Sequence, residues 1–157
     1  MDLIFNTYLI LGLIVFIYMS FWFGVAILLK RNDVADIAWG IGFLICALYA
    51  YLFLGDIFGK SLIVLFLVAM WAFRLSIHIF IRNKGKKEDS RYKKWREDWG
   101  KYFLPRTYLQ VFLLQGLLML VVVMPAVVAI IFGGKISWFD CVGVVNWYNF
   151  CNYKICL

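Results

Sequence analysis

Residues 3–29 read LIFNTYLILGLIVFIYMSFWFGVAILL, a stretch without a charged side chain that decides the class of fold. About 20 apolar residues in a helix span the ~30 Å hydrocarbon layer of a membrane. Only a helix lets a lone spanning segment satisfy its own backbone hydrogen bonds. We therefore predict a membrane helix over residues 3–29. The stretch is too long for a signal peptide and follows Asp2 rather than a basic segment, so we expect it in the mature protein.

Three further apolar stretches, residues 34–54, 61–81 and 108–132, have the same character. The 157 residues are 65% hydrophobic, 20% aromatic and 16% charged, which excludes a water-soluble globule because the polar residues cannot cover the surface. The prediction is one all-α membrane domain, a polytopic transmembrane helix bundle with four spans plus an incomplete fifth. Asparagines interrupt the fifth stretch, residues 136–157, from Asn146 onward, so we expect a degenerate tail there.

The positive charge lies mainly in the polar loop predicted for residues 82–107. From Arg82 to Arg106 there are ten Lys+Arg against four Asp+Glu, and Lys30 and Arg31 fall on the same side of the membrane. Basic loops favour the cytoplasm, so the loop is expected inside and the N-terminus outside. This placement explains the net charge of +7 without nucleic-acid binding. The four cysteines and single histidine lack the spacing of a metal site. We interpret the cysteines as small apolar packing residues, and a disulfide among Cys141, Cys151 and Cys156 stays open.

A polar stripe follows the third predicted helix. Its members, at spacings i, i+3, i+7 and i+11, are Trp71, Arg74, His78 and Arg82. Arg74 would lie roughly 12 Å deeper than Arg82, so we expect neighbouring helices to shield it. His78 fits either a general acid or a hydrogen-bonded packing residue.

Polar residues on the neighbouring helices have two interpretations each. Asp33 and Asp36 begin the second span, either as counter-charges for the third helix or as helix-capping residues. Gln115 lies at the estimated depth of Arg74. It would either hydrogen-bond between helices, with Gly116 permitting close approach, or line a pocket.

The segment from Lys84 to Lys101 mixes basic and aromatic residues. It suits an amphipathic helix lying on anionic headgroups through Trp95 and Trp99. Alternatively, its arginine and tyrosine beside Arg82 could hold a phosphorylated ligand, because Arg pairs bidentately with phosphate.

Three strings carry a resemblance to a known family: NDVADIAWGIGF (32–43), WAFRLSIHIFIRNKGKKEDSRYKKWREDWGK (71–101) and VFLLQG (111–116). They resemble the little-characterised branch of the steroid 5-alpha-reductase-like membrane proteins, over roughly residues 32–125. The resemblance implies transfer of hydride from NADPH to an activated double bond of a lipid-like substrate, such as a sterol enone. It names no catalytic residue. The cofactor-binding residues that it implies are Asp36, Arg74, His78, Arg82, Asn83, Glu88, Asp89, Arg91 and Tyr92.

The chain departs from the family in lacking the arginine-histidine-proline motif of its second half. We therefore expect a truncated member with an incomplete cofactor site, inactive alone or completed by another chain. A small membrane binding or assembly protein without enzymatic activity is the alternative. A transporter or channel fragment is disfavoured because no polar residues continue the stripe outward. The expected partners are membrane lipids, a lipid-like substrate, and a second copy or a complementing chain.

Overall fold

The computed structural model describes residues 2–55, 59–85 and 90–152, and within these ranges it contains helices and turns but no strand. Four helices are long and apolar enough to cross a membrane. The predicted all-helical bundle is therefore confirmed, and its four long apolar helices are those of a multi-pass membrane protein.

The first three spans lie close to their predicted limits. They are α1 (Asp2–Leu29), α2 (Val34–Leu54) and α3 (Lys60–Asn83). The fourth consists of a π-helical segment, η2 (Tyr108–Leu113), that continues directly into α6 (Leu114–Ile131).

The basic segment, expected as a loop that contains an amphipathic helix, is helical where the structure describes it. Where it is described, it forms α4 (Ser90–Trp99), the 3-10 turn η1 (Gly100–Tyr102) and α5 (Phe103–Thr107). Tyr92, Trp95 and Trp99 recur at helical spacing and give α4 an aromatic face. The rings of Trp95 and Trp99 stack with centroids 5.1 Å apart. The helix and its aromatic face agree with the amphipathic helix expected within residues 84–101.

The last helix, α7 (Trp138–Asn152), corrects the expected break at Asn146. Asn146 and Asn149 are exposed, so their amides leave the backbone hydrogen bonds of the helix intact. At 15 residues α7 measures about 22 Å, less than the ~30 Å of a full span. Within the described residues, α7 is not among the four helices that are long and apolar enough to cross a membrane.

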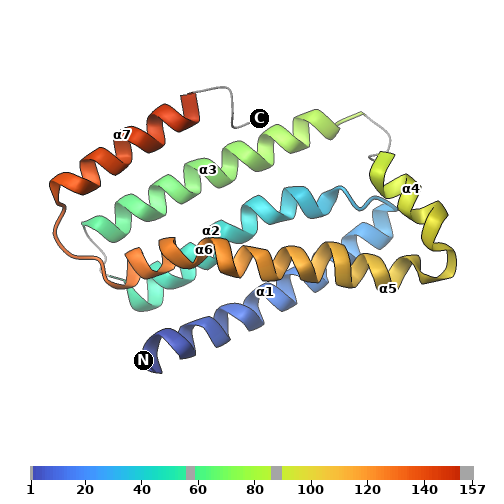
Figure 1. Ribbon diagram of the computed structural model, residues 1–157, viewed down its shortest axis with the longest axis horizontal. Coiled ribbons are helices and arrows are strands. Elements are labelled where there is room, and N and C mark those ends of the chain that lie inside the picture. Colours follow the sequence, from blue (N-terminus) through green and yellow to red (C-terminus); the bar gives the residue numbers. More distant parts are fainter. Residues whose placement is uncertain (1, 56–58, 86–89, 153–157) are drawn as a thin grey trace.

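Helix α2 is central and packs against α1, α3 and α6 (Figure 1). Small residues permit these approaches: a Cβ added to Gly40 would lie 3.2 Å from the carbonyl oxygen of Ala72 on α3. Gly116 likewise lets α6 approach α1, as predicted, since its Cβ would lie 3.1 Å from Val15. The α1–α2 turn, the end of α3, α4 and α5 share one end of the bundle, here called the basic end (Figure 1).

Candidate functional site

An apolar crevice of about 450 Å³ lies between α2, α3 and α6, and is here called the central crevice. Its lining residues are Phe43, Val64, Leu67, Val68, Trp71, Val122, Val123, Ala126 and Trp147. The indole of Trp147 comes from α7, so this short helix contributes to the wall. The lining suits an apolar molecule and offers few polar contacts.

An ion pair and a helix cap hold the start of α7. Lys60 Nζ lies 3.0 Å from Asp140 Oδ1, which links α7 to the first turn of α3. The backbone N–H of Ser137 donates to Asp140 Oδ2 at 2.8 Å. This hydrogen bond and the neighbouring ammonium group lower the pKa of Asp140 below its ordinary 3.8.

Polar side chains continue the faces of the central crevice toward the basic end. Asp36 precedes Phe43 by seven residues on α2, and Gln115 precedes Val122 by seven on α6. His78 follows Trp71 by seven on α3. Seven residues are about two helical turns, so each polar residue shares a face with its apolar partner. Each of these three helices therefore carries one polar residue on the same face, about two turns nearer the basic end.

An aromatic row connects the walls. The ring of Phe43 packs edge-on against Trp39 and Trp71, with centroids 5.0 and 5.1 Å away. Trp39 Nε1 also donates to the backbone oxygen of Gln115 at 3.2 Å. The aromatic side chains of α2 thus contact α3 through Trp71 and α6 through the backbone of Gln115.

Gln115 joins α6 to α2 through its amide. Nε2 donates to Asp36 Oδ1 at 3.2 Å, which fixes the orientation of the amide because a carboxylate needs a donor. Among the described residues the buried Oε1 has no hydrogen-bond partner. Gln115 follows the π-helical segment η2, an irregularity that is frequent at functional sites. The structure therefore confirms the first interpretation of Gln115, a hydrogen bond between helices, and Gln115 is not among the residues that line the central crevice.

The stripe on α3 lies differently from the prediction. Arg74 and Arg82 are exposed and His78 is half-buried, so the expected shielding of Arg74 by neighbouring helices of this chain is wrong. The reason is the rotation of α3. It turns Ala72 and Ser76 toward α2, and Arg74, two residues from each, points about 160° away from both.

Two of the remaining predicted residues, Asn83 and Tyr92, lie at the basic end of the bundle. Asn83 is half-buried and accepts weakly from Arg82 Nε at 3.4 Å. Tyr92 is buried, with its ring edge against Trp95. Glu88 and Asp89 lie outside the described residues, as does the side chain of Arg91.

Asp33 corrects another expectation. It precedes α2 but makes no capping hydrogen bond, and its carboxylate pairs with Arg31 rather than with the arginines of α3. The two bonds measure 3.1 Å from Nε to Oδ1 and 2.6 Å from Nη2 to Oδ2. Arg31 Nη2 also donates to the backbone oxygen of Asn83 at 3.3 Å, so the pair fastens the α1–α2 turn to the end of α3.

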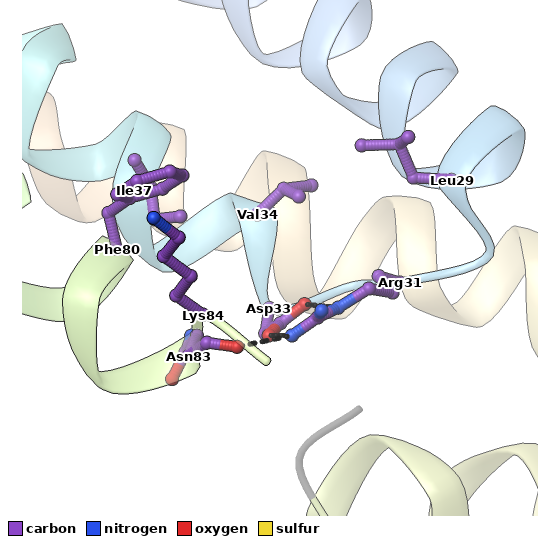
Figure 2. A pocket seen from close by; sticks show the side chains of 8 residues that line it. All are labelled: Leu29, Arg31, Asp33, Val34, Ile37, Phe80, Asn83 and Lys84. Atoms are coloured by element: carbon purple, nitrogen blue, oxygen red, sulfur yellow. Dashed lines mark hydrogen bonds and ion pairs between the residues drawn. The ribbon is translucent and has the colours of Figure 1, made fainter. Parts of the chain in front are cut away.

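A second cavity of about 250 Å³ lies at this junction, and is here called the turn cavity (Figure 2). Its lining residues are Leu29, Arg31, Asp33, Val34, Ile37, Phe80, Asn83 and Lys84. Sequence reasoning missed the cavity and the role of Arg31. The only local signal for the ion pair was the opposite charge of Arg31 and Asp33, two residues apart. The contact of Arg31 with Asn83 had no local signal, because the two residues are 52 positions apart.

Comparisons with known proteins place the chain in a family. No curated protein and no solved structure matches it. A family model described as "Protein of unknown function (DUF1295)" matches residues 22–151, a longer stretch than residues 32–125 of the sequence resemblance. This family is known to include steroid 5-alpha-reductase-like proteins. The chain, a helical protein with four apolar spans, therefore belongs to the DUF1295 family.

Proposed function

We propose that the chain carries the substrate crevice and part of the cofactor surface of an NADPH-dependent membrane reductase. The substrate would be a lipid-like molecule with an activated double bond, such as a sterol enone. One observation carries the proposal: the helix faces that line the apolar central crevice carry Asp36, His78 and Gln115 about two turns nearer the basic end. An apolar body with one polar group matches this division.

The described residues offer suitable groups for the cofactor. Arg74 and Arg82 expose guanidinium groups along one side of α3, with His78 between them, where they could pair with phosphates. The buried Oε1 of Gln115 is an acceptor for a carboxamide or hydroxyl donor of a ligand. When bound, NADPH would supply the hydride. The chain would hold the phosphates, exclude water from the crevice and orient the substrate.

Membrane orientation is part of the same proposal. The basic end would face the cytoplasm, in accord with the distribution of lysine and arginine. A soluble nucleotide would then reach Arg82 directly, while a lipid would enter the central crevice from the bilayer.

Titration of the full chain in nanodiscs with NADPH tests the proposal, with nucleotide fluorescence as the readout. We expect saturable binding that Arg82→Ala weakens about tenfold, since a hydrogen bond to a charged group contributes ~1.5 kcal/mol or more. Arg106→Ala is the matched control, because Arg106 is also exposed at the basic end but lies over the ring of Trp99. Absence of saturable binding to a folded protein, or equal effects of both variants, would contradict the proposal.

We propose membrane assembly without catalysis as the second candidate. The exposure of Arg74 within a span favours it, because charged residues of a membrane helix usually face protein or water. A second copy or a complementing chain could cover this surface as well as a cofactor could. Native mass spectrometry distinguishes the candidates: a dimer that Arg74→Ala dissociates, without any NADPH binding, would favour assembly.

A further inference from the structure

The turn cavity has an apolar part and a polar part. Leu29, Val34, Ile37 and Phe80 supply hydrocarbon from α1, α2 and α3. The polar lining comes from the α1–α2 turn and from the last residues of α3 and those that follow it. Helix ends lie at the level of the headgroups when the helices span a membrane. The cavity therefore crosses the boundary between acyl chains and headgroups.

The charges of the turn cavity leave one positive group available. Arg31 and Asp33 neutralise each other as a bidentate pair, and Asp33 is only 3% exposed. Lys84 is exposed, and no ion pair joins it to any residue in the described ranges. Its side chain extends back along α3 toward Ile37 and Phe80 (Figure 2). An ammonium group thus lies beside the apolar part of the cavity.

The backbone of the turn is built to hold this arrangement. Lys30 adopts a left-handed conformation, with φ of 53°, at the end of α1. The N–H of Arg31 bonds to Ala26 O at 3.0 Å and that of Lys30 to Ile27 O at 3.2 Å, which is the Schellman pattern. This cap directs Arg31 back over Asp33 and keeps the polar wall in place.

We propose that the turn cavity binds an anionic phospholipid, with its phosphate at Lys84 and an acyl chain along Ile37 and Phe80. A free phosphate would leave the apolar lining unused, and a neutral lipid would leave the ammonium group without an anion. The apolar lining lies on another side of α3 from the proposed cofactor surface, and the two sites adjoin at Asn83, which lines the cavity and accepts from Arg82. Phe80 follows His78 by two residues, about 200° around α3, and so faces the opposite side.

Lipid titration of the full chain in detergent tests this site, with bound lipid counted by native mass spectrometry. Phosphatidylglycerol should bind about fivefold more tightly than phosphatidylcholine of the same chain length, the ratio expected from one lysine near an anionic headgroup. Lys84→Glu should abolish this preference. Lys101→Glu reverses a charge at the same end but outside the cavity, and should preserve it. Phe80→Ala should weaken the binding of both lipids.

Three results would overturn the proposal. They are equal affinity for the two lipids, an unchanged preference in Lys84→Glu, and displacement of phosphatidylglycerol by inorganic phosphate, which would assign the cavity to a soluble phosphate compound. Circular dichroism confirms that each variant is folded, and Lys84→Gln replaces Lys84→Glu if the reversal disrupts the helix end. NADPH binding is measured separately, so failure of one proposal leaves the other intact.

Discussion

Replacement of Gly40 by alanine tests how closely α2 and α3 must approach. The added Cβ would meet Ser76 Oγ and would lie 3.2 Å from the backbone oxygen of Ala72. The serine cannot rotate away without losing its hydrogen bond to Ile37 O at 3.1 Å, and the backbone oxygen cannot move independently of α3. The helices must therefore separate slightly, which would also shift Trp71 in the central crevice.

The expected cost follows from two opposing terms. Overpacking costs about 1–3 kcal/mol. Alanine in place of glycine within a helix returns about 0.5–1 kcal/mol. From the middle of each range we expect Gly40→Ala to lower the free energy of unfolding by about 1 kcal/mol. Gly24→Ala is the matched control: nothing lies within 4 Å of its Cβ position, so the same substitution should be neutral or stabilising.

Equilibrium unfolding in mixed micelles with increasing sodium dodecyl sulfate, followed by far-UV circular dichroism, measures both variants. The double variant Gly40→Ala/Ser76→Ala should recover only part of the loss, because the contact with the oxygen of Ala72 remains. If Gly40→Ala is as stable as the unmodified chain, or if Gly24→Ala loses as much, the close approach described here is incorrect.

Three further predictions concern polar contacts. Asp140, with its pKa lowered in the folded state, stabilises the docking of α7 above pH ~4 and loses this effect as the pH falls through the lowered value. The hydrogen-exchange protection factors of α7, which correct for the slower intrinsic exchange in acid, should therefore fall in acid, and in Asp140→Asn they should already be low at neutral pH. Gln115→Leu removes an amide donor from Asp36 and should cost about 1 kcal/mol by micellar unfolding, whereas an unchanged midpoint would mean that the bond contributes nothing. Arg31→Ala leaves the buried carboxylate of Asp33 without this partner and should cost about 2 kcal/mol, after allowance for the partial exposure of Arg31. The double variant with Asp33→Ala should be less destabilised, and equal losses would argue against the ion pair.

The candidate site could be predicted only in its composition. Helical spacing put Trp71 and His78 on one face of α3, and the interpretation of Gln115 as a hydrogen-bonding residue between helices is confirmed by its contact with Asp36. Spacing within one helix does not define its rotation about its own axis. Small residues of α2 and α3 fix that rotation, and for this reason Arg74 is exposed rather than enclosed.

The sequence alone determined that lipid surrounds this protein, where its four spans lie and which end is basic, because hydropathy and charge are properties of consecutive residues. Only the tertiary structure decided which polar groups meet. Gln115 bonds to Asp36 across 79 positions, and Arg31 bonds to the end of α3 across 52. Such pairs depend on how helices distant in sequence rotate and close on one another, and that is fixed by the packing of all their side chains together.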